Sequence, residues 1–233
     1  MASRGANASI SRAAARDVSG SAFFAPHKIT SPLAALWEEA LAHTVPSGRR
    51  ALALDATAGR GRDALQLAQL CSRLRLPGAR LLALDSSDIA ISSTRSLLAS
   101  AKHRTDENDN AFWPRVDVLQ CDHAHLESCL HTEDVLAVAA FNLGYLPQLS
   151  PGTERDATLT QPETTATALQ ASLRRLHSNG LLTVAVYLGH GAYDELDAVR
   201  CILNELNPRE FTTMELSFAN RAKAPILIYT VRH

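Results

Sequence analysis

The strongest constraint on the fold is an alternation of short apolar runs with helical patterns along the chain. Five apolar runs occupy residues 50–56, 79–85, 114–122, 135–147 and 181–189. Helical patterns separate most of them, and strands separated by helices become parallel neighbours in a sheet. Two later apolar runs are joined only by a short loop, which predicts an antiparallel hairpin. The expected fold is therefore α/β, with a seven-stranded, mostly parallel sheet, an antiparallel C-terminal strand and helices on both faces.

The helical patterns have recognisable starts and ends. They cover residues 31–45, 63–71, 88–103, 162–180 and 192–206. In the fourth of these helices, Thr160 and Glu163 match a capping box, and Asn179 and Gly180 match a helix end. We therefore expect that helix to run to about residue 180.

The first 27 residues differ in composition from the rest of the chain. They contain three arginines and one acid among many Ala and Ser residues, as organelle transit peptides do. An ordinary disordered tail is the alternative. We expect residues 28–233 to form one domain, located in a mitochondrion or chloroplast if the tail is a transit peptide and otherwise in the cytoplasm.

The composition limits the classes of function. The 23 basic and 24 acidic residues leave a net charge of −1, so a nucleic-acid contact must be a local patch. No apolar stretch approaches the roughly 20 residues of a membrane span, so we expect no membrane association. The four cysteines form no Cys-x-x-Cys pair, and we expect reduced thiols in an intracellular protein.

A glycine-containing loop follows the first predicted strand, where open parallel sheets bind ligands. Gly59 and Gly61 permit close approach of a ligand to the backbone, and the helix beginning near Arg62 offers free N–H groups. The third glycine of the dinucleotide-binding pattern is missing, since Asp63 or Ala64 stands there. A structural tight turn is the alternative interpretation. The candidate ligand-binding residues of this loop are Asp55, Thr57, Gly59, Arg60, Gly61 and Arg62.

Polar residues also end the second and third predicted strands. Asp85, with Ser87 beside it, is placed to accept hydrogen bonds from both hydroxyls of a ribose, although it might instead cap the next helix. Asp122 could accept from an adenine amino group, with His123 and His125 near it, or it could stabilise a polar turn. No carboxylate or cysteine completes a metal site with these histidines, so we expect no metal.

Five stretches in this order resemble the rRNA methylase family of class I S-adenosylmethionine (SAM)-dependent methyltransferases. They are DATAGRGRD, FNLGYLP, QPETT, YLGH and SFANRAKAP, and the resemblance covers residue 29 to the C-terminus. It implies the Rossmann-like class I fold, SAM as cofactor and RNA methylation. Members of the family convert 5-aminomethyl-2-thiouridine at the tRNA wobble position to its methylaminomethyl form. The implied partner is therefore the anticodon region of a tRNA.

The stretch FNLGYLP stands where amino-group methyltransferases of this fold keep their catalytic motif. We expect the Asn142 carbonyl oxygen, with backbone carbonyls of Leu143 or Gly144, to accept the N–H bonds of the acceptor amine and direct its lone pair. Tyr145 could pack on the planar group of the acceptor. A tight turn at Gly144 and Pro147 is the alternative.

Further residues are expected around the acceptor. The candidate substrate-binding residues are Gly144, Arg155, Tyr187, His190, Asn220 and Arg221. Arg155, Arg221 and Lys223 could pair with phosphates, or they could be solvated loop residues. The chain departs from the family at Arg60 and Arg62, where relatives often have small polar residues, at Leu188, which replaces a common histidine, and in its longer 148–160 connection.

Two other classes of function remain open from the sequence. A nicotinamide-dependent oxidoreductase would use the glycine loop and Asp85 equally well, but the missing third glycine and the C-terminal hairpin disfavour it. A non-catalytic RNA-binding protein could keep the same fold. The oligomeric state, a homodimer included, is not determined by the sequence.

Overall fold

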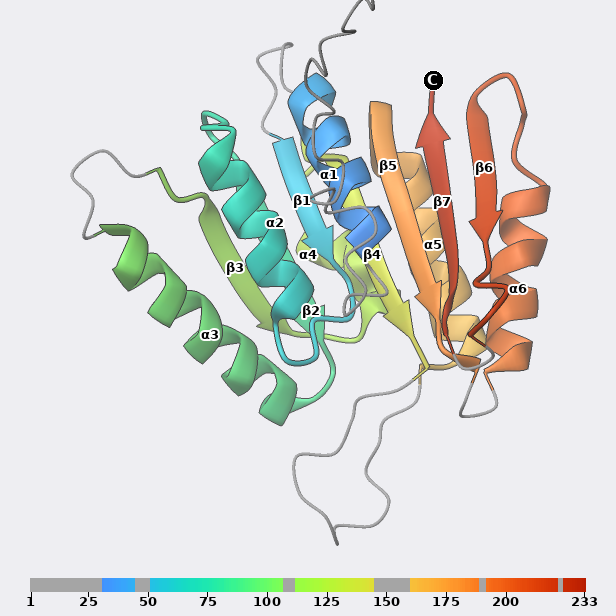
Figure 1. Cartoon of the computed structure of the whole chain (residues 1–233), viewed down its shortest axis with the longest axis horizontal. Helices are drawn as coiled ribbons and strands as arrows, with labels where there is room; N and C mark the ends of the chain where they lie inside the picture. Colours follow the sequence, from blue (N-terminus) through green and yellow to red (C-terminus); the bar gives the residue numbers. More distant parts are fainter. Residues whose placement is uncertain (1–30, 45–50, 107–111, 145–159, 189–191, 222–223) are drawn as a thin grey trace, which may run out of the picture.

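A computed structural model describes residues 31–44, 51–106, 112–144, 160–188, 192–221 and 224–233 (Figure 1). These residues build one seven-stranded sheet with helices packed on it. The strands are β1 (Ala51–Asp55), β2 (Arg80–Asp85), β3 (Arg115–Gln120), β4 (Val135–Leu143), β5 (Leu176–Val186), β6 (Phe211–Leu216) and β7 (Ile226–Arg232). The main helices are α1 (Ser31–Thr44), α2 (Arg62–Arg73), α3 (Asp88–Asp106), α5 (Pro162–Arg175) and α6 (Tyr193–Asn204). The short helices η3 (His123–His125) and α4 (Leu126–Cys129) follow β3.

The strand order is β3-β2-β1-β4-β5-β7-β6. The first five strands along the chain pair in parallel, and β7 lies antiparallel between β5 and β6. The predicted sheet and its C-terminal hairpin are therefore confirmed. Between β1 and β4 the chain reverses the direction in which it adds strands, and this switch point is where open α/β sheets bind ligands.

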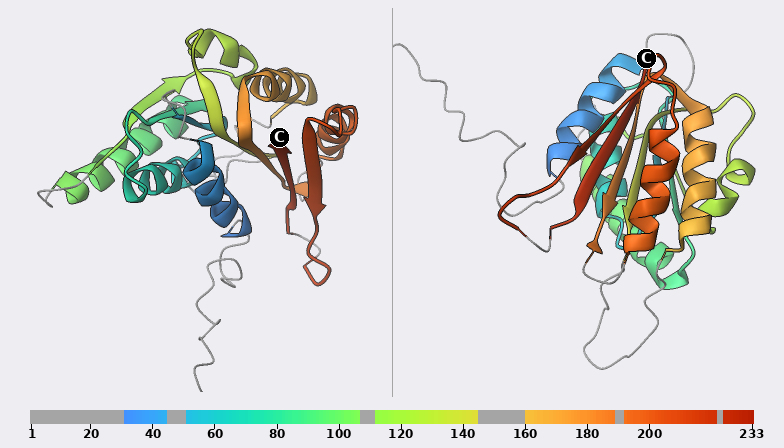
Figure 2. Two further views of the ribbon diagram at one scale, coloured as in Figure 1. Left: turned by 90° about the horizontal axis from the view of Figure 1, so that it is seen from above. Right: turned by 90° about the vertical axis from the view of Figure 1, so that its right-hand side faces the viewer.

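Helices cover both faces of the sheet, as the sequence predicted (Figure 2). α1, α2 and α3 lie on one face, and α4, α5 and α6 lie on the other. Alternate residues of a strand feed the two cores: Leu81 and Ala83 pack under the first set of helices, whereas Leu82 and Leu84 pack under the second. Because both faces are buried, the central strands are apolar almost throughout.

Two local predictions about α5 were wrong. The helix ends at Arg175, and Asn179 lies inside β5 with φ of 63°. Leu136 pairs with Leu176 but Val138 pairs with Leu181, so the left-handed residue belongs to an irregularity in the strand. The N-cap of α5 is Gln161, and the expected capping box is absent there because the hydroxyl of Thr160 contacts residues outside the helix.

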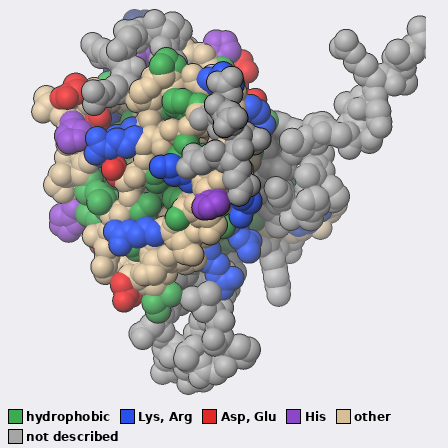
Figure 3. All heavy atoms as spheres, turned by 90° about the vertical axis from the view of Figure 1, so that its left-hand side faces the viewer, with side chains coloured by type: hydrophobic (Ala, Val, Ile, Leu, Met, Phe, Trp, Pro, Cys, Tyr) green, Lys and Arg blue, Asp and Glu red, His purple; other side chains and the backbone are tan. Residues whose placement is uncertain are grey.

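Exposed cations lie along α3, at the β3 edge of the sheet. Arg95, Lys102 and Arg104 are exposed on this helix, and Figure 3 shows Lys and Arg side chains spread over the face that α3 helps to form. Arg95 also donates from its guanidinium to the Val118 carbonyl at 2.8 Å, which ties α3 to β3. Because α3 also carries Asp88 and Asp106, its three cations leave only a small excess of positive charge on this helix.

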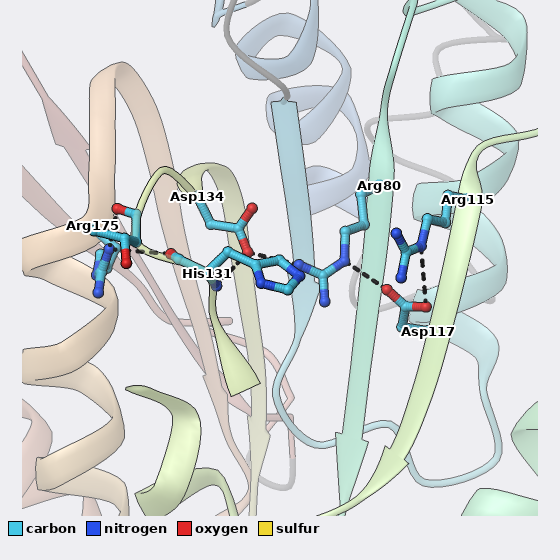
Figure 4. Close-up of polar contacts among 7 residues, drawn as sticks. Arg80, Arg115, Asp117, His131, Asp134 and Arg175 are labelled. Carbon is cyan, nitrogen blue, oxygen red and sulfur yellow. Dashed lines mark hydrogen bonds and ion pairs between the residues drawn. The ribbon is translucent and has the colours of Figure 1, made fainter. Parts of the chain in front are cut away.

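A buried ion network joins the amino ends of three strands (Figure 4). Arg80 begins β2, is 8% exposed, and contacts carboxylates of Asp117 on β3 and Asp134 before β4, each at 2.6 Å. The backbone N–H of His131 also donates to Asp134 at 2.9 Å, and Arg115 contacts Asp117 at 3.3 Å. The buried cation thus ties β2 to its neighbour β3 and to the start of β4, which lies on the far side of β1 in the sheet.

The described ranges contain neither a membrane-spanning helix nor a cluster of metal ligands. No helix there is long and apolar enough to cross a membrane. Nor does that part of the chain bring three or more His, Cys, Asp or Glu side chains together in a way that could hold a metal ion. The four cysteines are free thiols.

Removing Arg80 should destabilise the protein strongly. We expect Arg80→Ala to lower the free energy of unfolding by about 3 to 5 kcal/mol, because it leaves two carboxylates without their buried cation. The matched control is Arg200→Ala, which removes an ion pair with Glu215 whose side chains are 41% and 36% exposed and should cost below about 1 kcal/mol. Urea unfolding followed by circular dichroism measures both, and equal losses would contradict a special role for the buried network.

Candidate functional site

The predicted site residues that the structure describes lie at the carboxyl edge of the sheet. β1, β2, β3, β4 and β5 all end at this edge, in the lower part of Figure 1. The β6–β7 connection reaches the same edge, because Ile226 at the start of β7 pairs with Val186 at the end of β5. The topology therefore brings together residues that are far apart in the sequence.

The glycine loop lies between β1 and α2. Gly59 and Gly61 have φ of 52° and 76°, a region where residues with a Cβ are strained. A Cβ on Gly61 would lie 2.9 Å from both the Cα and the Oγ1 of Thr94, so only glycine fits. Gly61 is also the N-cap of α2 and has no side chain to cap the helix, so the helix start can offer N–H groups to an anion.

Asp85 fixes this loop to the end of β2. One carboxylate oxygen accepts the backbone N–H of Gly59 at 2.8 Å, and the other accepts that of Ser87 at 2.9 Å. Ser87 in turn accepts the Ala90 N–H at 3.4 Å at the start of α3. Each oxygen of an ionised carboxylate can accept a further hydrogen bond. Asp85 is therefore an organiser of the loop that keeps acceptor capacity for a ligand.

The residues after β3 differ from one another in their surroundings. Asp122 accepts the Ala124 N–H at 2.8 Å and caps η3. His123 is 8% exposed and packs edge-on against Phe141, with ring centroids 6.2 Å apart. Burial lowers the pKa of His123, so its ring is neutral near pH 7. His125 is exposed. The two histidines therefore do not share one environment.

Asn142, at the end of β4, is held at its backbone and at its side chain. Its backbone N–H donates to the Thr57 hydroxyl at 2.7 Å, and its side-chain NH₂ group donates to Asp63 at 2.6 Å. Sequence analysis noted Asp63 only as a residue in the place of a glycine. The contact between this first-turn acid and Asn142 could be predicted only once β1 and β4 were known to be neighbours in the sheet.

A second carboxylate lies beneath this contact. Asp55 is fully buried, and one of its oxygens accepts the Thr57 N–H at 3.3 Å. Burial, followed by the charge of Asp63, raises the pKa of Asp55 well above its ordinary value. Burial also raises the pKa of Asp63, while the Asn142 hydrogen bond and Arg62 lower it. The site therefore contains two interacting acids next to Asn142.

Gly144 follows β4 and lies close to the end of β5. It has φ of 112°, and a Cβ there would lie 3.0 Å from the Tyr187 carbonyl oxygen. Tyr187 donates its backbone N–H to Leu143 at 3.1 Å. The pKa of the half-buried Tyr187 hydroxyl is raised by burial and by Asp63. Gly144 and Tyr187 are therefore neighbours, as the substrate-binding prediction requires.

A buried acid on α6, missed by the sequence analysis, anchors the backbone of Gly144. The Gly144 backbone N–H donates to the Thr160 hydroxyl at 3.0 Å, and that hydroxyl donates to the Glu195 carboxylate at 2.8 Å. Thr165 donates to the other Glu195 oxygen at 2.6 Å. Glu195 is only 2% exposed, although its first-turn position on an amphipathic helix resembles that of an ordinary surface acid. These contacts also explain why Thr160 is not a helix cap.

The remaining candidates divide into exposed residues and residues that are not described. Arg60 is half-buried, and Arg62, Asn220 and Arg221 are exposed. Arg221 donates its backbone N–H to Phe218 in a turn between β6 and β7, at the carboxyl edge. Tyr145, Arg155 and His190 lie outside the described residues. Their predicted roles remain predictions.

Residues 81–232 match the family described as "Putative rRNA methylase". The chain belongs to this family. It is thus a member of a methyltransferase family, and the resemblance noted in the sequence is confirmed.

Two solved structures and one curated protein are among those that the chain resembles. A structure described as a "putative rRNA-methylase" from Clostridium thermocellum has 26% identity and a TM-score of 0.65, over 84% of this chain and 94% of that one. A "putative methyltransferase" from Streptococcus mutans, in complex with SAH, has 28% identity and a TM-score of 0.66, over 85% and 97%. The curated relative is the chloroplastic tRNA (mnm(5)s(2)U34)-methyltransferase of Arabidopsis thaliana, 29% identical over 76% of this chain. The match spans 61% of the length of that relative.

Proposed function

We propose that this protein methylates RNA with SAM, and that its substrate is the aminomethyl group of 5-aminomethyl-2-thiouridine at the wobble position of a tRNA. The observation that carries the proposal is the double anchoring of Asn142 beside the glycine loop. The Arabidopsis relative is named for a wobble-uridine methyltransferase, and the Streptococcus mutans relative holds SAH. Both names support the proposal.

The carboxyl edge fits the parts of SAM. The start of α2 presents N–H groups for the methionyl carboxylate, and both oxygens of Asp85 retain acceptor capacity for the ribose hydroxyls. Ile89, four residues beyond Asp85, is 56% exposed and offers apolar surface close to the expected position of the adenine. Asp122 uses only one oxygen for its cap, so the other can accept from the adenine amino group.

Residues of the chain must then orient the acceptor amine of the substrate toward the methyl group of SAM. When bound, SAM supplies an electrophilic methyl group. An amine attacks with its lone pair, so it must be neutral, and carbonyl acceptors can orient its N–H bonds without acting as a full base. Because the NH₂ group of Asn142 donates to Asp63, its carbonyl oxygen is the end that remains for this task. The amine nitrogen would form the new bond to the methyl carbon while the carbon–sulfur bond of the donor breaks and its electron pair stays on sulfur, which leaves S-adenosylhomocysteine. The methylated ammonium would then lose its proton to water.

The RNA requires a positively charged surface, although the chain has a net charge of −1. Arg95, Lys102 and Arg104 are exposed on α3 and Arg221 is exposed at the carboxyl edge, so these side chains can pair with phosphates. These local cations fit a partner such as the anticodon region of a tRNA. A non-catalytic RNA-binding protein would use the same surface, and only turnover distinguishes the two.

Replacing Asp85 should weaken cofactor binding. We expect Asp85→Ala to reduce the affinity for S-adenosylhomocysteine by about 1 to 3 kcal/mol, because a charged acceptor at the ribose and the anchor of Gly59 are both lost. Isothermal titration calorimetry measures this. The control is Asp88→Ala, which removes a nearby exposed acid. Unchanged affinity in Asp85→Ala, or tight binding of NAD by the wild type, would argue against the assigned ribose contact.

Replacing Asn142 should separate binding from turnover. Asn142→Ala removes a polar side chain at the end of β4 and should fold, with S-adenosylhomocysteine affinity within a few-fold of wild type. Single-turnover methylation of tRNA carrying 5-aminomethyl-2-thiouridine should fall roughly 10²-fold or more, the scale of lost alignment. Methylation at the wild-type rate would show that the catalytic centre lies elsewhere. Binding of this tRNA by the wild type without turnover would favour the RNA-binding alternative.

We also propose that residues 1–27 direct the protein to an organelle, since the Arabidopsis relative is named as chloroplastic. These residues lie outside the described part of the chain. Fused to a fluorescent reporter, they should send it to chloroplasts or mitochondria by microscopy. A version with Arg4, Arg12 and Arg16 replaced by Ala is the control and should stay in the cytosol. A cytosolic reporter in both cases would refute the targeting role and leave the enzymatic proposal intact.

A further inference from the structure

Asp63 and Asn142 meet across the switch point of the sheet. Asp63 lies in the first turn of α2, whereas Asn142 lies at the end of β4, and a carboxylate oxygen is 2.6 Å from the amide nitrogen. The Asn142 backbone is fixed separately by the Thr57 hydroxyl. The backbone of Asn142 is thus held in place, and the contact with Asp63 determines which end of the side-chain amide faces away from Asp63.

We propose that Asp63 is a positioning residue, whose carboxylate holds the NH₂ end of Asn142 and so turns the Asn142 carbonyl oxygen toward the acceptor amine. An ionised carboxylate only accepts hydrogen bonds, so it can pair with the NH₂ end and not with the carbonyl. The free end is then an acceptor, which is what an amine N–H needs. This role rests on the proposed function.

The opposite charge state gives the opposite orientation. A protonated Asp63 can donate its O–H to the Asn142 carbonyl oxygen. The amide then turns over and presents its NH₂ group to the amine, which offers donors of its own. Protonation of Asp63 therefore converts an acceptor at the reacting centre into a donor. The ionised form of Asp63 is the form that supports methyl transfer.

Two neighbours of Asp63 favour that ionised form and act against burial, which raises its pKa. Asp55 is 0% exposed and its Oδ2 has no hydrogen-bond partner within the described residues. Of the two acids, Asp55 is the more buried, and burial raises its pKa well above the ordinary value. Asp63 is half-buried and is stabilised by Asn142 and by Arg62. Asp85 on β2 and Tyr187 after β5 also face this pair of acids and interact with it electrostatically.

Nuclear magnetic resonance of the side-chain amide tests the orientation without any RNA. The chain has eight asparagines, so protein labelled with ¹⁵N-asparagine gives few side-chain NH₂ signals, and Asn142→Ala assigns the relevant one. We expect one Asn142 proton to be shifted downfield by the carboxylate, and the shift to disappear in Asp63→Ala but to persist in Asp88→Ala. Asp88 is the matched control, because it is also a first-turn helix acid but is exposed.

The same signal in wild-type protein covers the case in which Asp63→Ala does not fold. Acidification should shift the Asn142 NH₂ signal with a midpoint above the ordinary pKa of an aspartate, because burial raises the pKa of Asp63. Asp63 takes up a proton as the pH falls. The form in which its carboxylate accepts the hydrogen bond from the Asn142 NH₂ group is therefore populated above the midpoint. An Asn142 signal that ignores both pH and the Asp63 substitution would overturn the proposal.

Kinetics separate this inference from the proposed function. Asp63→Ala should lower kcat for methylation of the modified tRNA by about tenfold or more, with KM and S-adenosylhomocysteine affinity within about threefold of wild type. Wild-type kcat in Asp63→Ala would refute the positioning role while the proposed function stood. If the wild-type protein transferred no methyl group to tRNA, the proposed function would fail, and the amide spectrum would still decide whether Asp63 orients Asn142.

Discussion

The site depends on one contact across the centre of the sheet, the hydrogen bond from the Asn142 backbone to the Thr57 hydroxyl at 2.7 Å. From β1 the chain builds the sheet in one direction, and from β4 it builds in the other. The loops after these strands therefore diverge, and a crevice forms between them at the carboxyl ends of the strands. The Thr57 contact joins the two loops at the point where they separate. It keeps the glycine loop and the proposed catalytic residue in one fixed relation.

The two ends of the strands are stabilised in different ways. At the amino ends, Arg80 satisfies two carboxylates at once, which is an arrangement that favours a fixed structure. At the carboxyl ends, Asp55 is buried, one of its oxygens has no hydrogen-bond partner among the residues that the structure describes, and it lies close to another acid. Burying such a group destabilises the fold unless it takes up a proton. Perturbed acids of this kind concentrate at functional sites, which agrees with the proposed location of the chemistry.

Local sequence signals failed where a residue had a stronger partner elsewhere. Thr160 fits a capping box, but its hydroxyl bonds to the buried Glu195 and to the Gly144 backbone instead. Asn179 fits a helix end because asparagine tolerates positive φ, yet the same tolerance serves an irregularity inside β5. In both cases the conformational preference was judged correctly. The partners of Thr160 lie 16 and 35 residues away, and the irregularity at Asn179 depends on the pairing of β5 with β4, so a local pattern could not find either.

The sequence by itself determined the α/β class, the mostly parallel pairing of the strands, the C-terminal hairpin and the glycine loop with Asp85. Each of these depends on periodicity or on backbone conformations that only certain residues adopt. The tertiary structure alone decided the role of Asp63. Its 79-residue separation from Asn142 has no sequence period, and the contact exists because β1 and β4 are neighbours in the sheet. Burial, which a sequence does not display, then raises the pKa of Asp55 and Asp63 together. The acids and the amide form one site because the fold removes them from water side by side.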